Sequence, residues 1–330
     1  MMYYIESAST NPSYNLALEQ YVFDHLDRSA SYFMLWQNHN SIIVGKHQNT
    51  AAELNAAYVA EHDIQVVRRL SGGGAVYHDM GNLNFTFITD VVAGEAFDFS
   101  AFCSPVVSAL RSLGVNAEIA GRNDMTIDGG KFSGNAQYIR EGRVMHHGTL
   151  LFDSDLNILS QALRVPPDKY ISKGATSVRS RVTNIRPHLN KDISLRAFWD
   201  VLRDYMMAES HMQPYRLTDA DEAIVKALQA TVYSQRSWNY GRSPDFSIQK
   251  QRRIEGCGRI EVHMDVSQDT IRRLAFYGDY FGNGDSSELV ERLVGCKMEH
   301  DAVCQALENL SIGRYFNNLD LDSFVSVLLY

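Results

Sequence analysis

The fold is decided by residues 68–79, which read Arg68-Arg69-Leu70-Ser71-Gly72-Gly73-Gly74-Ala75-Val76-Tyr77-His78-Asp79. The preceding segment, 64–70, is rich in β-branched residues and predicts a strand that ends at the glycines. Consecutive glycines lack a Cβ, so this backbone can turn through positive φ and let a ligand lie against its amides. Arginine cations beside bare N–H groups suit a carboxylate or a phosphate. The alternative is a plain glycine-rich turn with solvated arginines.

The composition is that of a globular protein long enough for two domains. The chain has 330 residues, 45% of them hydrophobic and 21% charged, and we expect a sizeable core. No apolar run reaches bilayer-spanning length, and the first residues lack the basic and apolar segments of a signal peptide, so we expect a cytoplasmic protein. A formal net charge of −8 argues against a general nucleic-acid binder.

The cysteines predict neither a disulfide framework nor a zinc site. They are few and scattered, without CxxC spacing, and we expect small buried thiols in a reducing compartment. The four are Cys103, Cys257, Cys296 and Cys304.

The pattern of apolar residues, caps and turns predicts the order of elements. Up to residue 114 we expect a helix beginning after Asn11, strands over 32–36, 41–45, 64–70 and 83–89, and helices over 50–62 and 97–113. Residues 115–153 predict an antiparallel meander with strands 115–119, 125–127, 132–139 and 144–152. A helix over 155–163, a long polar connection over 168–191, and helices over 194–210 and 218–233 follow.

A plausible boundary at 243–245 precedes a second pattern. Strands over 259–266 and 271–277 are followed by helices over 286–294, 300–310 and 321–329. We therefore predict an α+β protein. A large, mixed, mostly antiparallel sheet domain flanked by helices is expected over 1–246, and a small C-terminal α+β domain over 247–330.

A second informative stretch surrounds Lys131. This lysine follows the turn Asp128-Gly129-Gly130 and precedes Gly134, so we expect its ammonium close to backbone. The stretch is not a Walker motif, because Phe132 stands where Ser or Thr is required. Nor does the first glycine loop match the dinucleotide fingerprint, since Tyr77 occupies the third glycine position. For Lys131 taken alone, a solvated surface lysine is the alternative.

Other polar residues near these stretches are ambiguous by themselves. Asn123 can both donate to and accept from an adenine edge, and Asp124 can bind Mg²⁺ or orient a cation, but both fit a polar turn. His146 and His147 lack the HExxH spacing of a zinc site and fit hydrogen-bonded strand histidines. Trp36 fits a core position as well as a pocket wall.

Together these stretches resemble the signature of the lipoate–protein ligases, within the biotin/lipoate ligase superfamily. The similar segments are 68–79, 81–87, 121–124, 131–136 and 146–151, in the family's order. Residues 173–184 resemble the adenylate-covering loop of the two-domain ligases, and 237–241 are similar to the end of their large domain. Beyond residue 245, only length and position suggest the family's small accessory domain.

The resemblance implies an ATP-dependent enzyme that salvages free lipoate in two half-reactions. Lipoate and ATP, with Mg²⁺, give lipoyl-adenylate and pyrophosphate, and the lipoyl group then passes to a carrier lysine. The implied carriers are lipoyl domains of 2-oxoacid dehydrogenase complexes and the glycine cleavage H protein, with no nucleic-acid or membrane partner. The small domain is expected to close over the nucleotide through a hinge near 241–255.

The resemblance also implies site residues. Lys131 is the implied catalytic residue, and Asp124 an implied metal ligand. The implied ATP and adenylate contacts are Arg69, Gly74, Ala75, Val76, Tyr77, Asn123, Asp124, Lys131, Gly148, Thr149, Lys173, Ser177 and Arg181. The implied lipoate contacts are Trp36, Arg69, Gly72, Gly73, Gly74, His78, Lys131 and His147.

The role assigned to Lys131 is electrostatic. An anionic carboxylate must attack an anionic α-phosphate, so a fixed ammonium with backbone amides and Mg²⁺ neutralises charge as it develops. The glycines are expected to floor an apolar slot for the lipoyl chain, with Trp36, Val76 and Phe85 as walls. The 168–191 loop is expected to order over the adenylate and exclude water.

Three other readings stay open at this point. One is an ATP-independent octanoyl or lipoyl transferase with a cysteine nucleophile, although Cys103 falls in an apolar helix and no cysteine neighbours the motifs. Another is a biotin–protein ligase, which would have a different glycine-rich signature. The last is a non-catalytic protein that binds a carboxylate or an adenylate.

Overall fold

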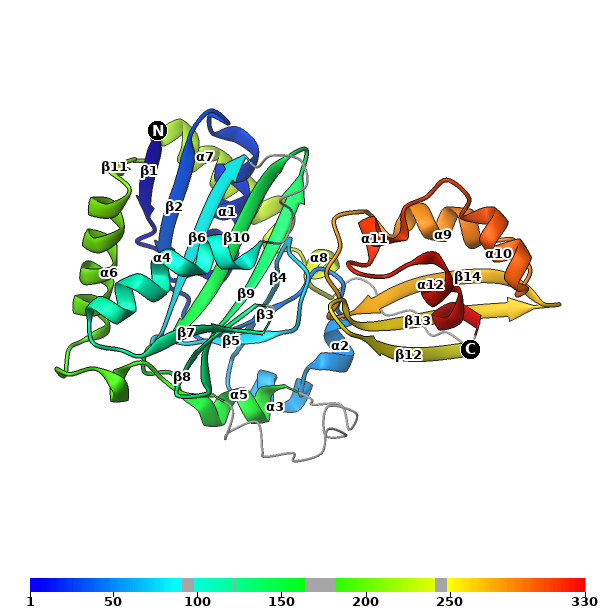
Figure 1. The fold of residues 1–330 in the computed structure, drawn as a ribbon, viewed down its shortest axis with the longest axis horizontal. Coiled ribbons are helices and arrows are strands. Elements are labelled where there is room, and N and C mark those ends of the chain that lie inside the picture. The colour runs from blue at the N-terminus through cyan, green and yellow to red at the C-terminus, as the bar shows by residue number, and fades with distance from the viewer. Residues whose placement is uncertain (91–97, 122, 164–181, 241–247, 330) are drawn as a thin grey trace. The chain divides into compact units, whose positions relative to one another are not determined.

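The computed structural model describes residues 1–90, 98–121, 123–163, 182–240 and 248–329, drawn in colour in Figure 1. The chain divides into two compact units. Unit 1 comprises Met1–Val44, Ala52–Arg69 and Ala75–Asn239, and unit 2 comprises Gly45–Ala51, Leu70–Gly74 and Tyr240–Tyr330. Lys131 therefore belongs to the first unit, whereas the glycine segment Leu70–Gly74 belongs to the second. The domain boundary expected at residues 246 and 247 stays a prediction.

Unit 1 is built on an eight-stranded sheet with the order β11-β1-β2-β6-β10-β9-β8-β7 (Figure 1). Strands β11, β1 and β2 run parallel, and every other neighbouring pair is antiparallel. The strands are β1 Met2–Glu6, β2 Ser31–Trp36, β6 Asn82–Asp90, β7 Ala117–Ala120, β8 Asp124–Ile127, β9 Gly130–Arg140, β10 Arg143–Leu151 and β11 Gln213–Pro214. The predicted α+β class with a mostly antiparallel sheet is confirmed.

Helices cover both faces of this sheet. On one face, side chains of α4 (Phe99–Ser112) and α6 (Leu195–Glu209) join Phe33, Phe85 and Phe132 in the main hydrophobic core. On the other face lies α1 (Pro12–His25), against which α7 (Asp219–Leu228) and the π-helical turn η4 (Gln229–Tyr233) pack. Helix α1 begins as predicted, because Oδ1 of Asn11 accepts from the backbone N–H of Tyr14 at 3.1 Å.

A second, three-stranded sheet carries the residues that flank the glycine loop. Its order is β4-β3-β5, with β3 Ser41–Val44, β4 Gln65–Arg68 and β5 Val76–His78. Strand β5 pairs antiparallel with β3 and forms the edge of this sheet. An edge strand keeps one row of backbone groups outside the ladder. The chain after the glycines is therefore a short strand, where the sequence indicated only a loop.

Unit 2 has its own sheet and core. Strands β12 Ile248–Ile254, β13 Gly258–Ser267 and β14 Thr270–Gly278 form an antiparallel meander. Its apolar face packs against α9 Ser287–Leu293, α10 His300–Ala306, α11 Ile312–Tyr315 and α12 Leu321–Leu329. Strands β13 and β14 and three of these helices match the sequence expectation, while β12 and α11 were missed.

Several local expectations were wrong. The single helix expected over 50–62 is two helices, α2 Thr50–Glu53 and α3 Ala56–Glu61, because Asn55 caps a new helix by accepting from the N–H of Tyr58. Strands β1 and β11 were not expected either. The remaining short elements are α5 Leu156–Ala162, the 3-10 turn η3 Arg186–His188 and α8 Arg236–Tyr240. All four cysteines are free, but only Cys103 and Cys257 are buried.

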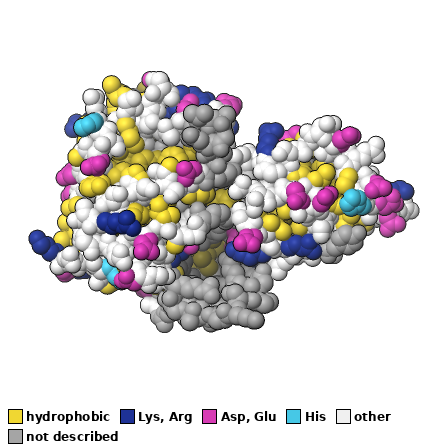
Figure 2. Space-filling view, in the orientation of Figure 1, with side chains coloured by type: hydrophobic (Ala, Val, Ile, Leu, Met, Phe, Trp, Pro, Cys, Tyr) yellow, Lys and Arg dark blue, Asp and Glu magenta, His cyan; other side chains and the backbone are white. Residues whose placement is uncertain are grey.

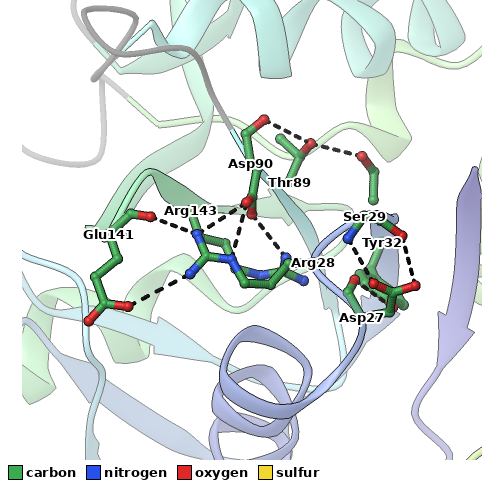
Figure 3. A network of polar contacts seen from close by, with 9 residues as sticks. Asp27, Arg28, Ser29, Tyr32, Thr89, Asp90, Glu141 and Arg143 are labelled. Carbon is green, nitrogen blue, oxygen red and sulfur yellow. Dashed lines mark hydrogen bonds and ion pairs between the residues drawn. The ribbon is translucent and has the colours of Figure 1, made fainter.

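At one end of the central strands, an arginine-rich network ties the sheet to the turn after α1 (Figure 3). Arg143 at the start of β10 is 1% exposed and its Nη1 lies 3.0 Å from Oδ1 of Asp90 at the end of β6. Arg28 lies 3.1 Å from the same carboxylate and donates to the carbonyl of Glu141 at 2.6 Å. The guanidinium of Arg143 also lies over the Tyr32 ring. This network fastens three chain segments together.

The surface carries charges of both signs. On the face shown in Figure 2, Lys and Arg side chains are interspersed with Asp and Glu among the coloured residues. Within the described part of the chain, no helix has both the length and the hydropathy of a bilayer-spanning segment.

Candidate active site

The candidate site is a row of residues that crosses the second face of the large sheet. Strand register places Trp36 of β2 opposite Asn84 of β6, and Asn84 opposite Thr149 of β10. The next residue of the row is Gly134 of β9, whose N–H donates to Oγ1 of Thr149 at 3.2 Å. Asp124 of β8 lies opposite Gly134. Residues directly opposite in antiparallel strands share a face, so these five positions form one line across five strands.

Lys131 is folded onto this line. Its Nζ lies 2.7 Å from Oδ1 of Asp124, and a Cβ built at Gly134 would lie 3.2 Å from the same nitrogen. The bare backbone of Gly134 therefore leaves space for the lysine side chain to cross the strand. The ammonium and the carboxylate are each more than a third exposed, so both groups can change partners when a ligand binds.

A β-bulge sets the direction of Lys131. Met125 pairs with Ser133 but Thr126 pairs with Lys131, which leaves Phe132 as an extra residue on β9. Bulges re-aim side chains and are frequent beside active sites. Here the bulge lets Phe132 enter the hydrophobic core, where it is fully buried, while Lys131 keeps the face of the row. The described segment that begins at Val182 is fastened at this point, because the N–H of Thr183 donates to the carbonyl of Lys131 at 2.8 Å.

A buried polar network supports the other end of the row. Nε1 of Trp36 donates to Oγ1 of Thr86 at 2.9 Å, and that hydroxyl donates to Oε1 of Glu19 at 2.6 Å. Nδ1 of His147 lies 3.0 Å from the same carboxylate oxygen. A carboxylate only accepts, so Nδ1 of His147 carries a proton. Glu19 on α1 thus fixes the orientations of both Trp36 and His147.

Arg69 and His78 lie deep beside this network. Arg69 is 6% exposed and donates to the carbonyl of Ile43 at 3.1 Å. Burial lowers its pKa to about 10, partly offset by the nearby charge of Glu19, so the guanidinium stays charged at neutral pH. Burial, then the charge of Arg69, lowers the pKa of His78 to about 3. His78 is therefore a neutral imidazole beside a buried cation.

The tautomer of His78 follows from its neighbours. Oδ1 of Asn38 accepts from the side chain of Asn15 at 2.8 Å, so the amide nitrogen of Asn38 faces Nδ1 of His78 at 3.1 Å. Nδ1 must then accept, and the proton sits on Nε2. Nε2 is a buried donor without a hydrogen-bond partner among the described residues, and the His78 ring contacts the Trp36 ring edge-on.

Arg68, the first of the two arginines before the glycine loop, has a structural role. The side chain of Arg68 donates to the carbonyls of Trp238 and Asn239, and Nε1 of Trp238 donates back to the carbonyl of Arg68. Arg68 is therefore engaged in fastening the end of unit 1. Of the two arginines that precede the glycines, Arg69 is the one positioned beside the buried network.

The three glycines of the loop serve three different needs. A Cβ at Gly72 would lie 2.5 Å from the carbonyl oxygen of Tyr280 within unit 2. Gly73 has φ +91°, which disfavours other residues. A Cβ at Gly74 would meet nothing within 4 Å. Among the described residues, the absence of a side chain thus leaves open space at Gly74 but not at Gly72. The expected opposition of Gly72–Gly74 and Lys131, which lie in different units, stays a prediction.

Not all residues expected to bind the nucleotide lie on the face of the candidate row. Val76 and Tyr77 lie in the edge strand β5, where the Tyr77 hydroxyl donates to Asn40 and burial raises its pKa to about 12. Ala75 lies just before this strand. Gly148 faces away from the row, since a Cβ there would lie 2.1 Å from Oδ1 of Asn135. Lys173, Ser177 and Arg181 lie outside the described residues.

Asn123 is partly committed to its own turn. Its Nδ2 donates to the carbonyl of Asn135 at 2.8 Å, while the N–H and Nδ2 of Asn135 donate to the carbonyl of Asn123 at 2.9 and 3.1 Å. Among the described residues this leaves Oδ1 of Asn123 as the edge that a ligand can approach. In the same part of the chain, no cluster of three or more His, Cys, Asp or Glu side chains is arranged to hold a metal ion.

The expectation that no cysteine neighbours the motifs was wrong. Sγ of Cys103 lies 3.9 Å from Nε2 of His146, which also contacts Asn135 and Gln137 on the core face of the sheet. Burial raises the pKa of Cys103 to about 12 and lowers that of His146 well below its usual value. The pair is a neutral thiol beside a neutral imidazole, facing away from Lys131, so it lacks the thiolate that a nucleophile needs.

Comparison with known proteins gives the family. The model described as the lipoyl protein ligase A/B catalytic domain matches residues 11–207, and the bacterial lipoate protein ligase C-terminus matches 243–328. The chain belongs to the lipoate–protein ligase family. It is 41% identical to lipoate–protein ligase 1 of Staphylococcus aureus, covering 97% of each chain. It is also 41% identical to the lipoate-protein ligase LplJ of Bacillus subtilis, covering 99% of this chain and 100% of the relative. The recognition made from the motifs is therefore confirmed.

Solved structures of the family share the fold. P. falciparum LipL1 in complex with lipoate superimposes with a TM-score of 0.81 at 24% identity over 100% of this chain and 99% of the other. A lipoate-protein ligase A bound with ATP matches 73% of this chain and 98% of its own at TM-score 0.63 and 26% identity. A bipartite ligase from Thermoplasma acidophilum, solved with its E2 lipoyl domain, matches 74% of this chain and 98% of its own at TM-score 0.65 and 28% identity.

The motif-based reading of the ligase missed residues that hold its site together. Glu19 lies outside the family-like segments, and Asn84 and Thr86 lie inside the segment 81–87 but were given no role there. A signal was nevertheless present in β6, where Asn82, Asn84 and Thr86 alternate with Leu83, Phe85 and Phe87. A strand that is buried on both faces yet polar at every second position marks a polar site on one face.

Proposed function

We propose that this member of the ligase family activates lipoate with ATP and transfers the lipoyl group to a carrier lysine. In the first step a lipoate carboxylate oxygen bonds to the α-phosphorus of ATP as the bond to the β-phosphate oxygen breaks, and pyrophosphate leaves. In the second step the carrier's neutral amine attacks the acyl carbon, AMP leaves, and the amine loses a proton as the amide forms.

The observation that carries the proposal is the placement of Lys131. Its ammonium lies over a bare glycine and is held by one half-exposed carboxylate, at the end of a row that leads to the buried tryptophan. A positive charge in that position offsets the negative charge that builds up when a carboxylate meets a phosphate. Full-length identity of 41% to two lipoate–protein ligases supports the same activity.

Separate groups are proposed for the two substrates. Trp36, His78 and His147 are assigned to lipoate, since they lie around one buried polar network, and Arg69 beside that network is assigned to both substrates. Gly74, Ala75, Val76 and Tyr77 are assigned to the nucleotide through their backbone, together with Asn123, Thr149 and Asp124. The assignments of Gly72, Gly73, Gly148, Lys173, Ser177 and Arg181 are carried by the family resemblance alone.

Magnesium is proposed as the partner of the ATP phosphates. Mg²⁺ takes oxygen ligands and commonly binds through one or two carboxylates plus substrate phosphates, which fits the single carboxylate of Asp124 in the row. When bound it would neutralise phosphate charge. For Asp124 to bind the metal, its ion pair with Lys131 must break, and the Lys131 ammonium then turns to the substrate.

The carriers and the compartment are also proposals. The chemistry requires an exposed lysine on a folded carrier, and lipoyl domains of 2-oxoacid dehydrogenase complexes and the glycine cleavage H protein present one. We assign the reaction to the cytoplasm, because all four cysteines are free and two of them are partly exposed.

The test is pyrophosphate release by the pure protein. Lipoate and MgATP without any carrier are expected to give pyrophosphate and lipoyl-adenylate, and addition of a lipoyl domain is expected to give a lipoylated lysine detected by mass. Omission of lipoate is the control. Folded protein that binds lipoate but releases no pyrophosphate would contradict the proposal.

The second candidate is a nucleotide-independent acyl transferase, for which the contact between Cys103 and His146 supplies, among the described residues, the one cysteine–histidine pair on the sheet that carries the motifs. Its test is Cys103→Ala. We expect full ligase activity from this variant, because the thiol is buried and protonated. Acyl transfer without ATP that disappears in Cys103→Ala would favour the transferase instead.

A further inference from the structure

Asn84 has a buried amide edge without a partner. The side chain is 1% exposed, and its Oδ1 accepts from Nδ2 of Asn82 at 2.9 Å. Nδ2 of Asn84 and Oδ1 of Asn82 have no hydrogen-bond partner within the described part of the chain. Exchanging both amide orientations would keep the hydrogen bond between them but would make the unpaired edge of Asn84 an acceptor, so the donor on Asn84 belongs to the orientations found in this structure. A buried polar group without a partner is unfavourable, and such groups are retained mainly where a ligand or water satisfies them.

The position of Asn84 indicates which kind of ligand would pair with its free amide edge. It stands in the row between Trp36 and Thr149, and the ammonium of Lys131 lies one strand beyond Thr149, over Gly134. Oγ1 of Thr149 accepts from the N–H of Gly134, which leaves its hydroxyl proton to donate. Three donors, an amide, a hydroxyl and an ammonium, therefore line one stretch of the sheet face.

Three donors in a row fit a carboxylate. A carboxylate placed over Thr149 would direct one oxygen toward Asn84 and the other toward Lys131. The apolar remainder of the acid would then extend toward Trp36. The half-exposed end at Lys131 and Asp124 is left for the phosphate.

We infer that Asn84 is an acyl-binding residue, which donates to the lipoate carboxylate oxygen that becomes the carbonyl oxygen of the adenylate. The inference rests on the proposed function, and it divides the work between two donors. Lys131 serves the oxygen that bonds to phosphorus, and Asn84 holds the oxygen that stays with the acyl group. In the second half-reaction the same amide stabilises the negative charge that develops on the carbonyl oxygen.

The experiment measures lipoate binding by calorimetry, without nucleotide, in the full-length protein and in Asn84→Leu, Asn84→Asp and Asn84→Ser. Asn84→Asp keeps the shape and the acceptor for Asn82 but removes the donor, whereas Asn84→Ser keeps a shorter donor. The second ligand is the alcohol made by reducing the lipoate carboxyl, which lacks both carboxylate oxygens.

Loss of one hydrogen bond to a charged group weakens binding about ten- to a hundredfold. We expect that loss for lipoate in Asn84→Leu and Asn84→Asp, a smaller loss in Asn84→Ser, and less than a threefold change for the alcohol. The KM for ATP is expected to stay the same. Thermal melting of each variant reports its folding.

Equal weakening of both ligands, or unchanged lipoate binding, would overturn the inference, because a structural asparagine affects acid and alcohol alike. The proposed function fails separately. Wild-type protein that binds lipoate in this Asn84-dependent way but releases no pyrophosphate would refute the ligase and leave the binding site standing. Wild-type protein that binds no lipoate would overturn both.

Discussion

Two ion pairs stand near opposite ends of the central strands and differ in burial. Arg143 and Asp90 close the pair β10–β6 at one end, where the guanidinium is 1% exposed and the carboxylate also binds Arg28 (Figure 3). Lys131 and Asp124 lie in the site row toward the other end, 39% and 36% exposed. The first pair is also bound by Arg28 and packed against the Tyr32 ring. The second is an ion pair whose two side chains are partly exposed to solvent.

This difference separates a structural pair from an exchangeable one. A buried guanidinium cannot lose its counter-ion without a large cost, so the Arg143 network stays in place. A half-exposed pair contributes little to stability, because water replaces either partner at small cost. Lys131 can therefore leave Asp124 for a phosphate or carboxylate. Charged motifs alone do not reveal this distinction, which depends on burial.

The largest expected effect is on catalysis, in Lys131→Ala. Lipoate-dependent pyrophosphate release should fall about 100- to 1,000-fold, as when a preorganised donor to a developing charge is removed. The free energy of unfolding should change by less than about 1 kcal/mol, since the lost pair is half exposed. Pyrophosphate assays and urea denaturation measure the two quantities. A variant that unfolds, or one that keeps its activity, would break the distinction between the pairs.

The converse effect is expected at the other pair. Asp90→Ala should lower the free energy of unfolding by about 2 kcal/mol, because it strips the buried Arg143 of its carboxylate, with a discount for the exposure of Asp90. The matched control is Arg143→Met, which removes the buried charge itself and should cost about 1 kcal/mol or less. Both variants should keep kcat. Equal destabilisation by both would show that packing, not charge, dominates this end of the sheet.

Asp124→Asn sharpens the comparison within the site. Pyrophosphate release should fall about tenfold, the worth of one hydrogen bond to a charged group, and more Mg²⁺ should be needed to reach half-maximal rate. Stability should stay within about 1 kcal/mol of the original protein. Titrations of the rate against Mg²⁺ measure the effect. An unchanged Mg²⁺ requirement would remove Asp124 from the metal assignment.

The last expected effect, which is absent at neutral pH, is the dependence of stability on pH set by His78. Its folded pKa of about 3 lies below the ordinary histidine value of 6.5, so the unfolded chain binds the proton more tightly. The melting temperature should therefore be insensitive to this group above pH 6.5 and fall as the pH drops from 6.5 toward 3. His78→Asn should flatten that slope. An identical slope in the variant would mean that other groups, such as His146, control it.

Much of this molecule was predictable from local patterns. The capped helix α1, the meander β7 to β10 and the glycine after α4 follow from side-chain caps, alternation and turn residues, which act over a few positions. The motifs around Arg69 and Lys131 sufficed for the family. The strand β5 and the contact between Cys103 and His146 were not predictable, because each depends on partners distant in the sequence. The split of α2 from α3 was missed although its signal, the cap residue Asn55, is local.

The sequence by itself determined the chemistry on offer: a lysine between glycines, an arginine before a bend, and a strand polar at alternate positions. Only the tertiary structure decided which of these groups act together. Strand register aligned Trp36, Asn84, Thr149, Gly134 and Asp124 across one face, and a single bulge turned Lys131 onto that line. The physical reason is that register and burial depend on long-range packing, which also decides whether a charge is locked in place or available to a substrate.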